Sequence, residues 1–311
     1  MIGAGEFLGT HVARALAAEV PVIELNADAD QETLDDAIAG VEIVVFCAQT
    51  VSPGRRLSYR KRPPASLQRV VEAARKARVR RIVQVSTADM LAPNQFMRVT
   101  ETSPVRSAHA FERIKLFEEE WLLGAAADVE VVILRAGRVF GEGEDWLLPR
   151  LMANATRGRV WLPGGGRAGQ TFVSAKDVGR ACLAASDRGR PGTRYLVGGF
   201  DSTWRELVHS AARAAGFLAE IGSVPYDLAY LRALAVESIT SPGAAVWPGL
   251  YAVDVLGKPH LLDDSWSRRE LTWSPSIGSF GQLMPAMTGW LTGLPEVSAA
   301  LAAEATSPPG R

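Results

Sequence analysis

Short apolar runs alternate with longer amphipathic stretches through the first two-thirds of the chain. The runs have strand length and occupy residues 20–25, 42–48, 80–86, 129–135, 170–174 and 193–198. Apolar residues at helical spacing fill Thr10 to Glu19, Ser66 to Arg78 and Ala108 to Leu123. This alternation predicts an α/β protein with a doubly wound parallel sheet covered by helices.

Glycine and proline gather in the later part of the chain, at residues 163–166, 190–192 and 241–243. They divide the sequence there into shorter, less regular pieces, which predicts a smaller C-terminal lobe. The chain closes on an alanine-rich stretch followed by Ser-Pro-Pro-Gly. We therefore expect a first domain over residues 1–165, a mixed lobe with returning strands over 166–300, and a flexible tail over 301–311.

Composition narrows the classes of function. The 34 basic and 34 acidic residues balance, which argues against a nucleic-acid binder and favours work on a small molecule. The basic run from Arg55 to Arg81 is then more simply a solvated face than a phosphate surface. Cys47 and Cys182 both lie in apolar runs, as expected of reduced, buried thiols rather than of a disulfide or a metal site. With no long apolar run and no export signal, we expect a cytoplasmic protein without a membrane partner.

The chain begins with a glycine-rich turn, Gly3-Ala4-Gly5-Glu6-Phe7-Leu8-Gly9, that opens into a helix. The free N–H groups and positive dipole end of such a helix suit a pyrophosphate. Only Met1 and Ile2 precede the turn, although the strand before it is normally central in its sheet. We therefore expect a truncated first strand, with its remainder upstream; a fold that tolerates the gap is the alternative.

Six segments carry a family resemblance. They are GAGEFLGTHVARAL from Gly3, EIVVFCAQT from Glu42, LQRVVEAARKARVRRIVQVST from Leu67, LRAGRVFGEG from Leu134, TFVSAKDVGRACLAA from Thr171 and RRELTWSP from Arg268. Together they resemble the extended or atypical short-chain dehydrogenase/reductase family, also called the NAD-dependent epimerase/dehydratase family. The resemblance implies a Rossmann-type nucleotide-binding domain over residues 1–165, a substrate lobe after it, and NAD or NADP as cofactor.

The cofactor turn departs from the family's G-x-x-G-x-x-G spacing. Gly3 and Gly9 match its outer positions, whereas Glu6 occupies the middle one and places a carboxylate where backbone should approach phosphate. An ordinary tight turn without a ligand is the alternative. By the resemblance, the cofactor positions are Gly3, Gly5, Glu6, Phe7, Leu8, Gly9, Asp28, Ala48 and Lys115. Glu24 and Asn26 compete with Asp28 to read the ribose, and an acidic group there favours NAD over NADP.

The catalytic positions depart as well. The family's relay uses a Ser or Thr, matched by Thr87, and a tyrosine whose pKa is lowered by a lysine four residues later on the same helix face. FERIK places Phe111 and Lys115 at those two positions. Because phenylalanine has no proton to exchange, the ordinary acid–base step is lost there. None of the five tyrosines offers a different register.

Other groups are candidates for the missing role. His109 precedes the helix and titrates near neutral pH, although a surface histidine is the commoner situation. Asp89 matches the second residue of the acidic pair in the family's dehydratases, but Ala88 occupies the first position, which disfavours sugar dehydration. Lys115 binds ribose, acts directly, or pairs with a glutamate of its own helix. No metal site is expected.

The resemblance assigns substrate contacts to Arg138, Trp146, Gln170 and Trp247. Eight tryptophans suit an apolar or ring-shaped ligand, although core packing explains them equally well. Three functions stay open: an altered oxidoreductase acting on a nucleotide sugar or secondary metabolite, a cofactor-independent lyase, isomerase or cyclase, and a non-catalytic cofactor sensor. The resemblance also implies a homodimer that pairs partly through the 108–123 helix.

Overall fold

The computed structural model describes residues 1–306 except 60, 93–97 and 127, so Arg60 of the basic run and residues 307–311 of the expected tail lie outside it. Its main sheet is parallel and has the strand order β1-β2-β3-β7. The strands are β1 (Ile43–Phe46), β2 (Arg81–Thr87), β3 (Glu130–Ala136) and β7 (Arg194–Val197). The predicted doubly wound sheet is confirmed.

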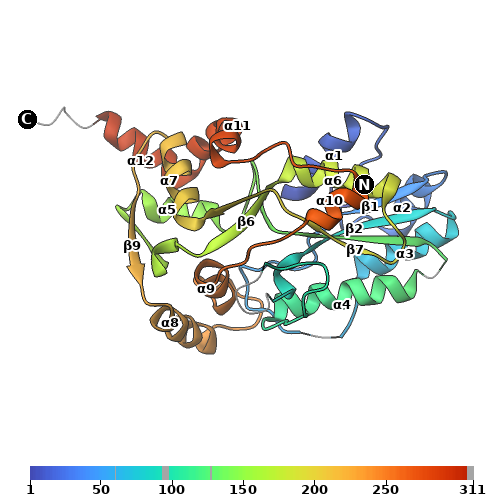
Figure 1. Ribbon diagram of the computed structural model, residues 1–311, viewed down its shortest axis with the longest axis horizontal. Helices are drawn as coiled ribbons and strands as arrows, with labels where there is room; N and C mark the ends of the chain where they lie inside the picture. The colour runs from blue at the N-terminus through green and yellow to red at the C-terminus, as the bar shows by residue number, and fades with distance from the viewer. Residues whose placement is uncertain (60, 93–97, 127, 307–311) are drawn as a thin grey trace, which may run out of the picture.

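Helices cover both faces of this sheet (Figure 1). One face carries α1 (Phe7–Ala17) and α6 (Ala175–Arg188), and the other carries α2 (Gln31–Ile38), α3 (Ala65–Lys76) and α4 (Ala110–Ala125). Successive strand residues alternate between the faces: Ile82 packs in the cluster with α3, and Val83 in the cluster with α1 and α6. Burial on both faces explains why these strands are continuous apolar runs. Cys47 and Cys182 are free thiols, and both are buried in the cluster that contains α1 and α6.

The first residues of the chain join the sheet through a single residue. Ile2 alone bridges both Leu25 and Phe46, donating to Val45 O at 2.8 Å and accepting from Cys47 N at 3.0 Å. The predicted strand over residues 20–25 is wrong, because only Leu25 pairs there. Ile2 pairs with Leu25 through an isolated bridge, and among the described residues this pairing does not continue along the rest of the segment. Helix α2, which the apolar pattern did not predict, follows this segment.

The smaller lobe combines two short sheets with helices. One sheet has β6 between β4 and β8, and the other pairs β5 with β9. Its elements are β4 (Arg138–Phe140), α5 (Leu148–Ala155), β5 (Arg159–Pro163), η2 (Gly164–Gly166), β6 (Gly169–Ser174), β8 (Phe200–Thr203), α7 (Trp204–Ala214), β9 (Glu220–Val224), α8 (Tyr226–Ile239), α9 (Leu250–Gly257), α11 (Phe280–Gly293) and α12 (Pro295–Thr306). Phe172, Trp204 and Phe280 form the aromatic centre of its core.

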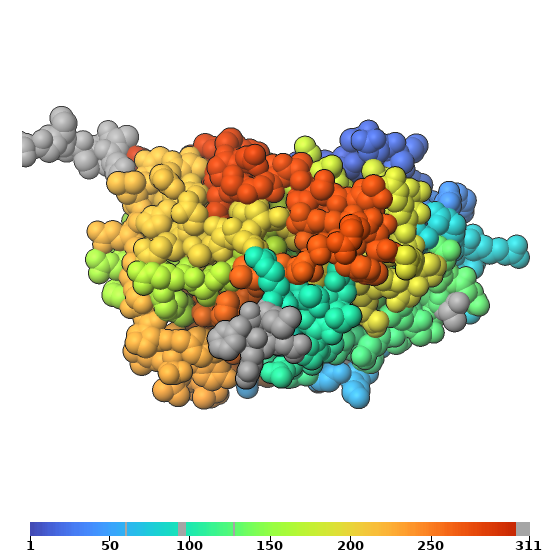
Figure 2. All heavy atoms as spheres, in the orientation of Figure 1, coloured from blue at the N-terminus to red at the C-terminus, as the bar shows by residue number. Residues whose placement is uncertain are grey.

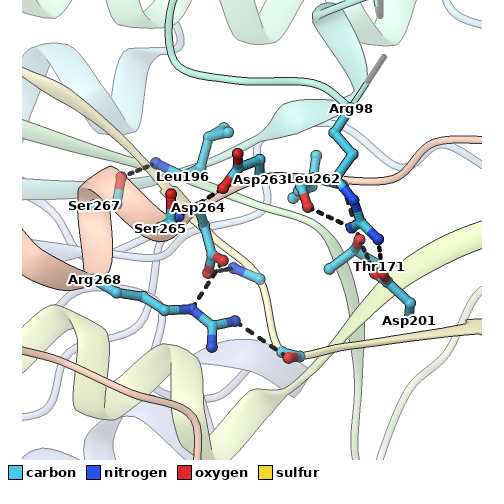
Figure 3. Close-up of polar contacts among 12 residues, drawn as sticks. Arg98, Thr171, Leu196, Asp201, Leu262, Asp263, Asp264, Ser265, Ser267 and Arg268 are labelled. Atoms are coloured by element: carbon cyan, nitrogen blue, oxygen red, sulfur yellow. Dashed lines mark hydrogen bonds and ion pairs between the residues drawn. The ribbon is translucent and has the colours of Figure 1, made fainter. Parts of the chain in front are cut away.

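A polar junction closes the two parts of the molecule against each other (Figure 3). Arg98 donates to Leu262 O at 2.9 Å and to Asp201 at 2.5 Å. The Thr171 hydroxyl donates to Asp201 at 2.6 Å and accepts from Leu262 N at 2.8 Å. Helix α10 (Ser265–Leu271) follows in the same C-terminal segment, which lies between the yellow and teal parts of the chain in Figure 2. The lobe is therefore held by a returning segment as well as by its connection to β3.

Helix α4 is anchored to the sheet by one buried carboxylate. Glu119 accepts from Arg135 of β3 at 2.6 Å and from Arg194 of β7 at 3.1 Å, and its side chain is fully buried. Because charge desolvated in this way is costly when it loses its partner, this contact holds α4 in place along the sheet. The residues of α4 that face the candidate site depend on that placement.

Removal of this carboxylate is expected to destabilise the fold. Glu119→Ala leaves the buried Arg135 guanidinium unpaired and should lower the free energy of unfolding by about 3–5 kcal/mol. Glu120→Ala, at the adjacent exposed position of α4, should change it by less than about 0.5 kcal/mol. Urea denaturation followed by circular dichroism measures both. Equal losses in the two variants would contradict the anchoring role.

Candidate active site

A cavity of about 190 Å³ opens where β2 and β3 end, between the glycine-rich turn and the smaller lobe. The carboxyl ends of parallel strands are where open α/β sheets bind ligands. The cavity brings together many of the predicted site residues, namely Glu6, Phe7, Leu8, Ala48, Thr87, Asp89, Phe111, Lys115, Arg138 and Trp146. Tyr251 of α9, which sequence reasoning placed only loosely in the substrate lobe, also lines it.

The glycine turn is packed as tightly as its spacing predicts. Gly3 has φ +92°, and a Cβ there would lie 2.8 Å from Ala48 N. A Cβ on Gly9 would lie 1.7 Å from Gly3 O, so strand and helix meet only because both residues lack side chains. Helix α1 begins without a side-chain cap. Its first N–H groups are therefore not satisfied by a capping side chain, and such groups can bind a phosphate.

Glu6 does not turn away from this cleft. It precedes the first residue of α1, lines the cavity, and accepts a hydrogen bond from Gln49 N at 2.5 Å with its carboxylate. The bond links the glycine turn to the loop after β1. The shape of the turn and the start of α1 fit a dinucleotide, while the Glu6 charge opposes the pyrophosphate that they would receive.

A second cavity of about 440 Å³ adjoins the turn on its other side. It is lined by Gly5 and by all three candidate ribose readers, Glu24, Asn26 and Asp28. A Cβ on Gly5 would lie 2.7 Å from Asn26 Oδ1, so the missing side chain opens this space. The position suits the adenosine half of a dinucleotide, with acidic groups beside its ribose.

Lys115 is committed to carboxylate and hydroxyl partners. Its Nζ donates to Glu118 at 2.9 Å and to Thr50 at 3.2 Å, and the Thr50 hydroxyl also donates to Glu118. The side chain of Glu118 is fully buried. This is the pairing within α4 that the sequence left open. The lysine charge is balanced inside the protein rather than placed beside a phenol at position 111.

A buried ion pair lies across the cavity from Lys115. Asp89, in η1 (Ala88–Met90) directly after β2, accepts from Arg138 of β4 at 2.5 Å and from the Tyr251 hydroxyl. Arg138 also donates to Gln170 at 3.0 Å, and Gln170 in turn donates to Lys258 O at 2.7 Å. The side chains of Asp89 and Arg138 are 7% and 9% exposed. Gln170 thus supports Arg138 from behind and does not line the cavity.

The ionisation of this cluster follows from burial and neighbouring charge. Burial opposes the charge on Asp89, but Arg138, His260 and the Tyr251 hydroxyl together lower the pKa of Asp89 below its ordinary value. Burial and the adjacent Asp89 carboxylate raise the pKa of Tyr251 well above 10. Burial also raises the pKa of Glu112, the acidic neighbour on α4. Asp89 is consequently a carboxylate and Tyr251 a neutral phenol.

Aromatic rings form one wall of the cavity. Tyr251 stacks on Trp146, with centroids 5.3 Å apart and planes 16° apart, and packs on Phe111 at 5.1 Å. Glu144 holds Trp146 by accepting from the backbone N–H groups of residues 146, 147 and 148 at 2.7–2.8 Å. The Trp146 indole N–H is buried without a partner among the described residues. A buried donor of this kind usually has a hydrogen-bond acceptor.

His109 lies behind this wall and not in it. Its Nε2 is 3.0 Å from Asp254, and its ring meets the edge of Tyr251 at 5.5 Å. Asp254 also accepts from Lys258 at 2.7 Å and from the Tyr226 hydroxyl. The carboxylate therefore joins the start of α4 to α8 and α9. Trp247, the remaining predicted substrate contact, packs against the lobe core under the Arg150 guanidinium, outside the lining of the cavity.

Three residues of the site escaped sequence reasoning in their present roles: Tyr251, Glu144 and Gln49. Tyr251 and Glu144 belong to the smaller lobe, and no short spacing relates them to residues 87–115. The one available signal was the pair of acidic residues just before Trp146, since a carboxylate ahead of a helix commonly caps it.

Within the residues that the structure describes, no group of three or more His, Cys, Asp or Glu side chains could hold a metal ion. None of the described helices is both long and apolar enough to cross a bilayer.

Comparison with known proteins agrees with this geometry. A profile of the NAD dependent epimerase/dehydratase family matches residues 1–198. The chain belongs to that family. A nucleoside-diphosphate-sugar epimerase from Pseudomonas aeruginosa has the same fold, with a TM-score of 0.71, 21% sequence identity, and coverage of 95% of this chain and 97% of that one.

Two curated proteins are related in sequence over most of the chain. One is 4-hydroxy-2-methyl-3-oxo-4-farnesyl-3,4-dihydroquinoline-1-oxide ketoreductase from Stigmatella aurantiaca, 28% identical over 260 residues, which cover 79% of this chain and 77% of that protein. The other is sterol demethylase protein B from Methylococcus capsulatus, 26% identical over 260 residues, which cover 79% and 78%. The chain is thus an oxidoreductase-like member of its family.

The contacts of Asp254 predict a pH-dependent contribution to stability. Burial opposes its charge, but His109, Lys258 and Tyr226 lower its pKa from 3.8 to about 2. Because the folded pKa is depressed, the stabilisation is present above pH 4 and is lost as the pH falls toward 2. Asp254→Asn should therefore lower the melting temperature at pH 7 by about 2–4 °C. Calorimetry should show this difference shrinking between pH 4 and pH 2.

The exposed Asp227 at the start of α8 provides a matched control. Asp227→Asn should leave the melting temperature within about 1 °C of the unchanged protein at either pH. A loss from Asp254→Asn that persists undiminished at pH 2 would contradict the assignment.

Proposed function

We propose that this protein is an NAD(P)-dependent oxidoreductase that acts on a secondary alcohol or ketone of a small, ring-bearing, largely apolar metabolite. The observation that carries the proposal is the wall of Phe111, Trp146 and Tyr251, which lines one cavity together with Thr87 in a member of this family. Flat aromatic walls bind ring systems through apolar contact and stacking.

The charges of the cavity support an apolar substrate over a nucleotide sugar. Among the described lining residues, the cations Lys115 and Arg138 both bond to carboxylates. The acidic residues that line the same cavity are Glu6, Asp89, Glu144 and Asp145. A substrate diphosphate would therefore meet net negative charge without a free cation. Both curated relatives are named for ring compounds, a quinoline oxide and a sterol, which agrees with this choice.

The chain's own residues supply binding and orientation. Gly3, Gly9 and the start of α1 would hold the cofactor pyrophosphate, and the cavity beside Asn26 and Asp28 its ribose. When bound, the nicotinamide would give or accept hydride at the substrate carbon. The Thr87 hydroxyl accepts from Asp89 N at 3.2 Å and keeps its proton to donate to a substrate oxygen.

Glu6 supports a second candidate. Its carboxylate, bound to Gln49 N, stands at the start of α1, where a pyrophosphate would bind. A cofactor-independent lyase, isomerase or cyclase would have no need of that space, whereas a non-catalytic cofactor sensor would bind the cofactor without turnover. Cofactor binding separates the first candidate from the oxidoreductase, and turnover separates the second.

Fluorescence titration with NADH and NADPH, followed by turnover of cyclic ketones read at the nicotinamide absorbance, tests the proposal. Binding of at least one cofactor and reduction of an apolar ring ketone in preference to a UDP-4-keto-sugar are expected. If neither cofactor binds at millimolar concentration, the oxidoreductase assignment is lost and the cofactor-independent candidate takes its place.

Neutralising Glu6 should strengthen cofactor binding. Glu6→Gln keeps an acceptor for Gln49 N but removes the like charge beside the pyrophosphate, and should lower the NADH dissociation constant about tenfold, or ~1.4 kcal/mol. Glu19→Gln, which removes an equal charge at the exposed far end of α1, should change it less than about twofold. Weaker binding by Glu6→Gln would show that the carboxylate contacts the cofactor favourably.

A further inference from the structure

Tyr251 brings a phenol to the ring that occupies the family's tyrosine position. Its ring lies 5.1 Å from Phe111, and its hydroxyl donates to Asp89 inside the cavity. Resting on the function proposed above, we propose that Tyr251 and Asp89 form the proton relay of the reaction, with Tyr251 passing the substrate proton to Asp89. The hydroxyl missing at position 111 is thus supplied from α9 of the smaller lobe.

The hydrogen bonds of Asp89 determine which of its oxygens accepts the proton. Asp89 Oδ1 is held by Arg138, whose Nε is in turn held by Gln170 at 3.0 Å, while Asp89 Oδ2 receives the Tyr251 proton. Each carboxylate oxygen thus has one assigned partner. Because the Tyr251 hydroxyl uses its proton on Asp89, its lone pairs are left to accept from a substrate hydroxyl.

The surroundings place that lone pair where a substrate would lie. Thr87, Asp89 and Tyr251 line the same cavity, and Trp146 stacks on the Tyr251 ring and limits its rotation. A ring alcohol lying on the Phe111 side of this wall would present its oxygen to both the Thr87 and Tyr251 hydroxyls. Two oxygen contacts are what a hydride step needs to orient the carbon that reacts.

Alcohol oxidation passes one proton to the relay and one hydride to the nicotinamide. The substrate O–H bond breaks as its proton bonds to Tyr251 Oη, and the original Tyr251 proton moves to Asp89 Oδ2. The C–H bond of the carbinol carbon breaks, its electron pair leaves with the hydrogen for the oxidised nicotinamide named above, and the C=O bond forms. Asp89 then returns its proton to solvent. Ketone reduction runs through the same atoms in reverse, starting from protonated Asp89.

The charged and titratable groups that face the relay suit this role. Arg138 of β4, Glu112 and His109 of α4, and the buried His260 surround Asp89 and Tyr251. Because the Tyr251 pKa is raised, the phenol stays protonated at neutral pH. It gives up its proton to Asp89 only as it receives another from the substrate. The lowered Asp89 pKa leaves a carboxylate ready to accept at neutral pH. Because the pKa of Asp89 is lowered below the ordinary value of an aspartate, oxidation should not depend on Asp89 ionisation at neutral or mildly acidic pH and should fall only below that ordinary value.

The test compares Tyr251→Phe and Asp89→Asn with Tyr226→Phe. Tyr226 is a matched control because its hydroxyl also donates to a carboxylate, that of Asp254, but outside the cavity. The probes are 1-tetralol and a 3-hydroxysteroid with NAD⁺ and NADP⁺. Tyr251→Phe and Asp89→Asn should each lower kcat about 100-fold with KM within threefold, and the double variant should be no slower than either alone. Tyr226→Phe should stay within threefold of the unchanged protein.

A second readout needs no turnover. With 13Cζ-labelled tyrosine in the cofactor-free protein, Tyr251→Phe should remove the resonance that titrates at the highest pH, and Asp89→Asn should move that resonance to lower pH. A melting temperature of Tyr251→Phe within a few degrees of the unchanged protein separates a lost proton path from a lost fold, whereas Asp89→Asn is expected to melt lower because it leaves the buried Arg138 without its carboxylate.

The outcomes distinguish the relay from the function on which it rests. Cofactor binding and alcohol turnover that survive Tyr251→Phe within threefold would overturn the relay and leave the oxidoreductase assignment in place. Strictly additive losses in the double variant would also overturn it, because a relay acts as one unit. A protein that binds neither nicotinamide, or turns over neither alcohol, would contradict the proposed function and the relay with it.

Discussion

The buried ion pair between Asp89 and Arg138 is the interaction on which the site depends. Asp89 lies in η1, directly after β2 of the main sheet, whereas Arg138 lies in β4 at the start of the smaller lobe. Two desolvated charges tolerate little displacement, because each is costly to bury without the other. The pair therefore sets the spacing of the two halves, and the Tyr251 hydroxyl joins it from α9. The width of the cavity follows from that spacing.

The sheet could be predicted because its strands are buried on both faces. Runs such as residues 80–86 and 129–135 are apolar throughout, and they become β2 and β3. The run over residues 20–25 looks similar but pairs only through Leu25, which bridges Ile2, because a strand also needs a neighbour that pairs along it. An apolar pattern describes one strand at a time and contains no information about the length of its neighbour.

The site was partly predictable for a related reason. Helical spacing places Phe111 and Lys115 on one face of α4, and both do line the cavity. The sequence left open whether Lys115 pairs with Glu118 or Glu119 of its own helix, because the choice depends on how α4 lies against the sheet. Tyr251 was harder still, because its contact with Asp89 exists only after the smaller lobe has packed against β2.

The contact of the Tyr251 ring with Phe111 bears on how relatives of this protein are classified. Motif inspection tests whether a given position of the chain carries a hydroxyl, and position 111 carries none. The reaction requires only that a hydroxyl oxygen lies in the right place, whichever helix it comes from. Some members of the family are classified as inactive because they lack this one tyrosine. In such proteins the opposite lobe merits inspection. A tyrosine ring packed against the substituted residue would show that a side chain from the other side of the cleft has taken its place.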